Sequence, residues 1–283
     1  MKLIAKSGSS KTEWMIVEGT HLIDSAVSEG LNPFFQNRRD ISRSIRLGLP
    51  SVFFKRKLET VYFYGAGCSS AEKKDIMKSS LIAQFRTPAE VESDLWAAAR
   101  GLFIDRTGIA CILGTGSNSC LYDGNEIVEN VKAAGYILGD EGSFVALGKM
   151  FLSDVLKGFA PDGLTDAFYR ENGLDSHAIM ANVYDLPFPH RFLMLTADFL
   201  AGYTDDRYVH ALIMQNLRNF FTRNVCRYEY GKYPVRFVGK MAVRYADMLR
   251  DVAGEFNIAI DRIQESPMKG LIEYHAGKNA LSP

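Results

Sequence analysis

The stretches LIAKSGSSKT at residues 3–12 and CILGTGSNSC at residues 111–120 carry nearly the same turn of small residues between two apolar runs. Aligning Gly8 with Gly116 pairs the neighbouring hydroxyl and amide residues at a constant offset of 108 positions. An apolar run, a turn of small residues and a second apolar run are typical of a tight β-hairpin. We call residues 7–12 the first tip and residues 114–118 the second tip. The repeat indicates two duplicated halves, each opening with a hairpin.

Both tips are rich in glycine and hydroxyl side chains. Glycine permits backbone conformations that a Cβ would obstruct, so such a turn can wrap backbone N–H groups around an anion. The alternative for each tip is an ordinary hairpin turn, because glycine and serine are common turn residues. Two tips in register, one at the start of each half, favour the interpretation that the halves hold a polyphosphate between them.

Length and composition limit the class of protein. A chain of 283 residues with 47% hydrophobic residues can bury two cores of unequal size. Lysine and arginine together number 33, as do aspartate and glutamate, so the formal net charge is zero and no basic stripe indicates a nucleic-acid partner.

The four cysteines show no CxxC pair and no histidine at ligand spacing, so we expect buried thiols and no confident metal site. No stretch has the length and apolar character of a signal peptide or a transmembrane helix. We therefore expect a cytoplasmic protein that has no membrane partner.

The periodicity of apolar residues predicts an alternation of strands and helices in both halves. In the first half we expect strands at 2–5, 12–17, 21–26 and 60–64, a helix at 40–48 capped by Asp40, and a helix at 71–85. In the second half we expect strands at 109–113, 119–122, 233–238 and 258–263, and a further strand after the turn at 123–125. We expect helices there at 144–157, 241–253 and 268–275, and a helical region over 163–230. Residues 105–108 are the best domain boundary.

Residues 87–103 allow two interpretations. Thr87 and Glu90 match a capping box with Pro88 at the first helical position, which predicts a helix from Pro88. Alternatively, residues 89–92 form a short strand, and Ser93 with Asp94 caps a helix over 95–103.

Taken together, these motifs resemble those of the sugar kinases in the actin–hexokinase–Hsp70 superfamily. The closest resemblance is to the N-acetylglucosamine kinases grouped with the BadF/BadG/BcrA/BcrD ATPases. It covers essentially the whole chain and rests on the two tips, GLNPF at 30–34, Asp94, LGDEGS at 138–143 and FVG at 237–239.

The resemblance implies an α/β fold of two ribonuclease-H-like, or actin-like ATPase, domains that close a cleft on ATP, Mg²⁺ and a small-molecule sugar. The domains would be residues 1–107 and 108–283, with the last helix packing back on the N-terminal domain. A homodimer is compatible with this arrangement. The implied activity is ATP-dependent phosphorylation of an amino sugar, most specifically N-acetylglucosamine.

The resemblance also implies roles for individual residues. Asp94 would be the general base at a helix start, which favours the second interpretation of residues 87–103. The nucleotide would contact Ser7, Gly8, Ser9, Ser10, Lys11, Thr12, Gly114, Thr115, Gly116 and Gly239. The sugar would contact Asn32, Ser117, Asn118, Gly135 and Asp140. Taken singly, Asp94 would more often be a helix cap, Asn32 with Pro33 a turn, and Asp140 with Glu141 a first-turn dipole pair, and only their joint occurrence favours the roles in the site.

Four positions depart from the family pattern. The family has an aspartate before the first tip, where this chain has Lys6, a side chain with no acceptor capacity. The other departures are Phe144, Lys240 and Lys269. Two alternatives to the kinase hypothesis follow: a catalytically impaired relative that binds sugar or nucleotide, and an activator-type ATPase.

Overall fold

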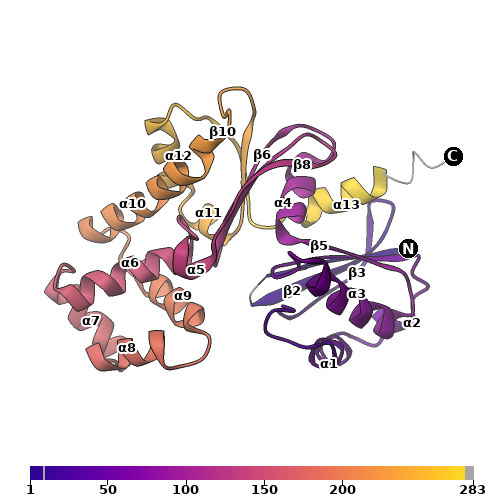
Figure 1. Cartoon of the computed structure of the whole chain (residues 1–283), viewed down its shortest axis with the longest axis horizontal. Coiled ribbons are helices and arrows are strands. Elements are labelled where there is room, and N and C mark those ends of the chain that lie inside the picture. The colour runs from indigo at the N-terminus through magenta and orange to yellow at the C-terminus, as the bar shows by residue number, and fades with distance from the viewer. Residues whose placement is uncertain (9, 278–283) are drawn as a thin grey trace. The chain divides into compact units, whose positions relative to one another are not determined.

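The computed structural model describes residues 1–8 and 10–277 (Figure 1). They divide into two compact units. The first contains Met1–Thr107, Tyr122–Ile127 and the segment from Ser266 onward, and the second contains Gly108–Leu121 and Val128–Glu265.

The first unit is built on a mixed five-stranded sheet in the order β3-β2-β1-β4-β5. Its strands are β1 (Lys2–Ser7), β2 (Lys11–Glu18), β3 (His21–Glu29), β4 (Thr60–Gly65) and β5 (Ala89–Ser93). The first three strands pair antiparallel, whereas β4 is parallel to both β1 and β5.

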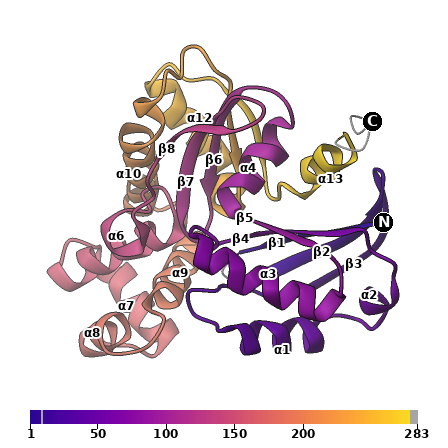
Figure 2. The same ribbon diagram turned by 45° about the vertical axis from the view of Figure 1, so that its right-hand side comes forward.

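Helices cover both faces of this sheet because its central strands β1 and β4 carry buried apolar side chains on both faces. One face, with Leu3, Trp14 and Phe63, packs against α1 (Arg38–Gly48) and α3 (Ala71–Phe85). The other face, with Ile4 and Tyr64, packs against α4 (Asp94–Phe103) and α13 (Met268–Gly277), as Figure 2 shows. The four-residue helix α2 (Val52–Lys55) lies in the α1–β4 connection.

The second unit repeats the same sheet and adds helices. Its sheet has the order β10-β9-β6-β7-β8. The strands are β6 (Gly108–Leu113), β7 (Ser117–Tyr122), β8 (Ile127–Val131), β9 (Val235–Val238) and β10 (Ile260–Gln264). The helices are α5 (Gly135–Leu138), α6 (Phe144–Lys157), α7 (Asp162–Asn172), α8 (Ser176–Tyr184), α9 (Pro189–Leu200), α10 (Arg207–Arg223), α11 (Lys240–Arg244) and α12 (Ala246–Glu255), with single 3-10 turns at Ala201–Tyr203 and Val225–Arg227. The core joins Leu113 of the sheet to Phe151 and Phe220 of the helices.

The shared strand order supports duplicated halves, and the predicted α/β fold class is confirmed. The predicted pairing of the tips, however, is wrong by two positions. The first two strands of each unit begin at Lys2 and Lys11 and at Gly108 and Ser117, an offset of 106 rather than 108 residues. Gly8 therefore corresponds to Gly114, since each directly follows the last residue of the first strand of its unit.

Other differences from the predicted elements have local causes. Helix α1 is capped by Asn37, whose Oδ1 accepts the N–H groups of Arg39 and Asp40 at 2.9 and 3.0 Å, so the expected cap at Asp40 is wrong. The helix predicted at 241–253 is interrupted at Tyr245. A helix from Pro88 is excluded because β5 pairs with β4 there. Among the described residues, every helix is too short or too polar to cross a membrane.

Candidate active site

The candidate residues of the first unit lie at the carboxyl ends of the parallel strands of its sheet. The parallel strands β1, β4 and β5 end there with Ser7, Gly65 and Ser93 in register. In open α/β sheets, ligands bind at the carboxyl ends of parallel strands. Lys6 and Asp94 stand at this edge.

Lys6 is flanked by carboxylates. It pairs across the sheet with Glu13 of β2, so both side chains leave the same face. A Cβ added to Gly8 would lie 3.5 Å from the Lys6 Nζ, which places the ammonium beside the first tip. The positive charge of Lys6 acts to lower the pKa of both Asp94 and Glu13. A cation therefore occupies the position where the resemblance implies an aspartate.

Asp94 is the first residue of α4 and directly follows β5. Burial raises the pKa of its carboxyl group, and this effect outweighs the charge of Lys6 and the hydrogen bonds from the backbone N–H groups of Leu95 and Asp94 itself. The carboxyl group is thus partly desolvated and stands at a helix N-terminus, where the dipole favours its ionised form.

Glu13 was not expected from the sequence to belong to this cluster. Its Oε1 accepts a hydrogen bond from the Lys11 Nζ at 2.6 Å, and its Oε2 accepts one from the Ser266 Oγ at 2.7 Å. Burial acts to raise the pKa of Glu13, but the hydrogen bonds from Lys11 and Ser266 and the charges of Lys11 and Lys6 lower it overall. No local pattern indicates this cluster, because Ser266 is 253 positions away in the chain.

Ser7 and Thr12 hold the first tip in place from beneath. Both are fully buried, and their hydroxyls hydrogen-bond to each other at 2.8 Å. The Ser7 Oγ accepts the Leu31 N–H at 2.9 Å, and the Thr12 Oγ1 donates to the Glu29 carbonyl at 2.9 Å. Their hydroxyls thus join the tip to the end of β3. Ser10 is exposed, and Ser9 lies outside the described residues.

Asn32 lies against the turn that follows β4. Its Oδ1 accepts the Phe34 N–H at 2.9 Å, and a Cβ on Gly67 would come within 2.1 Å of that oxygen. The charge of Asp94 acts on Cys68 of the same turn and helps to raise the pKa of its thiol, although burial is the larger cause. Residues 65–68 therefore border both Asn32 and Asp94.

In the second unit, the start of α6 holds the second tip. The Gly114 N–H donates to the Gly116 carbonyl at 3.0 Å and closes the turn. The carbonyls of Gly114 and Thr115 accept the N–H groups of Phe144 and Val145 at 3.0 and 3.2 Å. These bonds satisfy N–H groups of the first helical turn and immobilise the tip.

Asp140 and Ser117 are brought together beside this tip. The Asp140 Oδ1 accepts the Ser117 N–H at 3.2 Å, and a Cβ on Gly116 would lie 3.0 Å from the Asp140 Oδ2. Asn118 Oδ1 accepts the Ser119 N–H at 2.9 Å and the Asn130 Nδ2 at 3.1 Å. The pair of Asp140 and Ser117 thus sets a carboxylate against the second tip.

Two glycines predicted for ligand contact differ in their surroundings. Gly135 has φ +74° and open space where a Cβ would stand. Gly239 has φ +127°, and a Cβ there would meet the Leu113 carbonyl at 2.2 Å, so glycine is required where β9 ends beside β6. 

Beyond Gly239, Arg244 lies over the buried Phe144 ring at 4.7 Å and donates to Asp198 at 2.6 Å. These side chains occupy the space around the start of α6. Among the described residues, no three histidine, cysteine, aspartate or glutamate side chains group as a metal site.

No protein-family model and no curated protein matches the chain. A solved structure from Porphyromonas gingivalis, named "Putative N-acetylglucosamine Kinase", is 41% identical, with a TM-score of 0.92 over 99% of this chain and 100% of that one. The chain belongs to the N-acetylglucosamine kinase family of the actin–hexokinase–Hsp70 superfamily. Membership makes it a sugar kinase by class, as expected from the sequence motifs.

More distant structures share the fold of this kinase family. A protein from Chromobacterium violaceum, also named "Putative N-acetylglucosamine Kinase", is 18% identical, with a TM-score of 0.74 over 96% of this chain and 98% of that one. A ROK family glucokinase from Streptomyces griseus, solved with glucose and AMPPNP, is 13% identical, with a TM-score of 0.57 over 96% of this chain and 97% of that one.

Proposed function

We propose that the chain transfers a phosphoryl group from ATP to an amino sugar, N-acetylglucosamine first, with Asp94 as the general base. The observation that carries this proposal is the position of Asp94 at the start of α4, beside Lys6 and at the carboxyl edge of the sheet. Family membership supports the reaction class.

The surroundings of Asp94 suit proton acceptance. A general base works best when its pKa approaches the working pH, and burial moves the pKa of Asp94 upward from its ordinary value. The carboxylate orients the attacking sugar hydroxyl and takes its proton as the oxygen bonds to phosphorus. The phosphorus–oxygen bond to ADP breaks, and ADP leaves with that electron pair.

The proposed sugar contacts are polar groups already held in place. The Asp140 carboxylate is fixed against Ser117, and Asn32 and Asn118 each keep an amide beside a glycine-rich turn. Paired donors and acceptors of this kind suit sugar hydroxyls. Gly135, with open space at its Cα, would leave room for the acetamido group.

The residues at the end of β1 do not fit a magnesium ion. Mg²⁺ takes oxygen ligands in octahedral geometry, whereas Lys6 presents an ammonium there and Glu13 is already bonded to Lys11 and Ser266. The first-unit lysines instead suit the negative charge of a polyphosphate. No step of the proposed reaction is therefore assigned to a metal held at this position.

The same observation favours a second candidate function, a catalytically impaired relative that binds sugar or nucleotide. An ammonium supplies charge at one point and cannot bridge phosphate oxygens as a metal does. In this candidate, Asp140 and Asn32 still bind sugar, while phosphoryl transfer is slow.

An ADP-release assay with N-acetylglucosamine, N-acetylmuramic acid and glucose separates the candidates. Turnover that requires a sugar, highest with N-acetylglucosamine, supports the kinase proposal. Sugar binding by calorimetry without turnover supports the impaired relative. ATP hydrolysis that is equal with and without sugar contradicts both and indicates an activator-type ATPase.

A further inference from the structure

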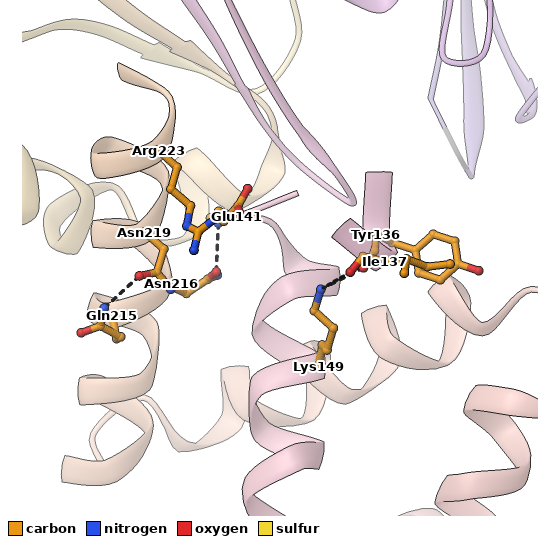
Figure 3. A network of polar contacts seen from close by, with 9 residues as sticks. Tyr136, Ile137, Glu141, Lys149, Gln215, Asn216, Asn219 and Arg223 are labelled. Atoms are coloured by element: carbon orange, nitrogen blue, oxygen red, sulfur yellow. Dashed lines mark hydrogen bonds and ion pairs between the residues drawn. The ribbon is translucent and has the colours of Figure 1, made fainter. Parts of the chain in front are cut away.

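Asn216 of α10 connects the helical part of the second unit to the loop that carries Asp140. Its side chain is fully buried. The Asn216 Oδ1 accepts the Gly142 N–H at 2.9 Å, and its Nδ2 donates to the Ser143 carbonyl at 3.0 Å. Figure 3 shows Asn216 extending from α10 to the loop beside Glu141. One amide therefore satisfies a backbone donor and a backbone acceptor of the same loop.

The loop needs such support because its backbone conformation is unfavourable for a non-glycine residue. Asp140 has φ +59°, and Gly142 has φ +78°. A left-handed conformation at Asp140 costs about 1 kcal/mol or more unless the surroundings impose it. The Asp140 N–H donates to the Ala133 carbonyl, and the Ser143 N–H donates to the Asp140 carbonyl, both at 3.1 Å. The bonds from Asn216 hold the C-terminal side of this turn.

One side of the loop borders a hollow rather than packed core. A cavity of about 220 Å³ is lined by residues that include Ile137, Glu141, Lys149, Asn216, Asn219 and Arg223. In Figure 3 the polar contacts around it come from α5, the loop, α6 and α10. Of these six lining residues only Asn216 is buried, since Lys149 and Arg223 are exposed and Glu141 and Asn219 are half-buried. The two hydrogen bonds of Asn216 therefore join the loop to α10 beside this hollow.

Asn216 also acts on the start of α6. Ser143 is the N-cap of that helix, and its Oγ accepts the Ala146 N–H at 3.1 Å. The next residues of α6 bind the carbonyls of the second tip. Fixing Ser143 thus fixes the loop, the helix start and the tip against which the Asp140 carboxylate lies.

We propose that Asn216 is a positioning residue that holds the Asp140 carboxylate against Ser117 in its sugar-binding position. This inference rests on the proposed function, because it assigns Asp140 to the sugar. Asn216 itself does not touch the sugar.

A double-mutant cycle tests the proposal. N-acetylglucosamine affinity is measured by calorimetry for the full chain, Asn216→Leu, Asp140→Asn and the double variant. Leucine has nearly the same shape but leaves the Gly142 N–H unpaired and leaves the Ser143 carbonyl with the Leu147 N–H as its donor, so we expect a sugar Kd about tenfold weaker. In the Asp140→Asn background the second change should add almost nothing, because residues that act as one unit are not additive.

Asn219→Ala is the matched control. Asn219 lies on the same helix and lines the same cavity, but its Oδ1 accepts from Gln215 rather than from the loop. Its sugar affinity should stay within about twofold, the spread of an ordinary surface change. Circular dichroism and thermal denaturation establish that each variant is folded. If Asn216→Leu does not fold, Asn216→Asp, which keeps the acceptor and loses the donor, takes its place in the cycle.

The possible results are distinct. Unchanged sugar affinity in folded Asn216→Leu, or losses that add fully in the double variant, would overturn the positioning role. Absence of N-acetylglucosamine binding by the unmodified chain contradicts the proposed function. In that case amide hydrogen exchange decides whether Asn216 fixes the loop: faster exchange at Gly142 in Asn216→Leu supports it, and unchanged exchange contradicts it.

Discussion

Replacing Lys6 with aspartate is predicted to increase sugar-dependent kcat by at least about tenfold, equivalent to roughly 1.4 kcal/mol of barrier. The substitution removes the ammonium beside Gly8 and supplies a carboxylate at the end of β1. With a carboxylate there, magnesium-ATP could be held with the metal near the transferring phosphoryl group, where its charge neutralises the transition state.

The predicted change in the barrier is small compared with the interaction energy of one pair of unit charges. A unit-charge pair at 4 Å interacts by about 4 kcal/mol at an effective dielectric constant of about 20. A gain of roughly 1.4 kcal/mol is about a third of one such contact, which leaves room for solvent screening at the half-exposed Lys6. The variant places a third carboxylate near Glu13 and Asp94, so we also expect a lower melting temperature.

Steady-state kinetics at saturating magnesium-ATP and N-acetylglucosamine provide the measurement, at a temperature where both forms are folded. Lys6→Met is the control, since it removes the charge without adding a metal ligand. Lys6 acts to lower the pKa of Asp94, so its loss raises that pKa further. The acidic limb of kcat against pH should move to higher pH in both variants, whereas only Lys6→Asp should gain kcat.

Two results together would refute this reasoning. If the unmodified chain turns over at a rate typical of kinases, in the range of about 1–100 per second, the cation is compatible with catalysis. If Lys6→Asp then gives no gain, Lys6 does not limit the reaction.

Three further predictions follow. Asp94→Asn should lower kcat by roughly two to four orders of magnitude with little change in sugar affinity, and undiminished kcat would remove the general-base assignment. Gly142→Ala should destabilise the fold by about 1–3 kcal/mol in thermal denaturation, because φ is +78° and the new Cβ would lie 2.7 Å from the Phe220 Cβ. Gly163→Ala, with open space and a helical backbone, is its control and should not lower the melting temperature. Because the pKa of Glu13 is lowered by folding, its contribution to stability is present above its unfolded value near 4.5 and is lost as pH falls through the lower folded value. Glu13→Gln should therefore flatten melting temperature against pH in that acidic range, and an unchanged slope would contradict the role of its ion pair.

Elements with strong local signals could be predicted from the sequence. Helices α3 and α6 have the predicted bounds because Ser70 and Ser143 cap them through hydrogen bonds within three residues. The position of Asp94 after a short strand followed from neighbouring residues together with the family resemblance. Family and fold class likewise followed from motifs that lie within a few positions of one another.

Contacts between distant segments could not be predicted in the same way. The tip offset was wrong because glycine occurs twice in the second turn, and only the bounds of the strands show which glycine corresponds to Gly8. The hydrogen bonds that join the buried hydroxyls of Ser7 and Thr12 to the end of β3 have no local sequence signal, because their partners lie 24 and 17 positions away in the chain. Asn216 is 74 positions from Gly142 and has no motif around it.

The sequence by itself thus determined the two hairpins, the main helices and the kinase family, because turns, caps and periodicity depend on interactions within one or two helical turns. Only the tertiary structure decided the electrostatic surroundings of Asp94 and the support of Asp140. Desolvation and the charge of Lys6 act across strands of the sheet, and the hydrogen bonds of Asn216 cross from one helix to a loop. Such interactions depend on distances in the folded chain, to which sequence separation gives no guide.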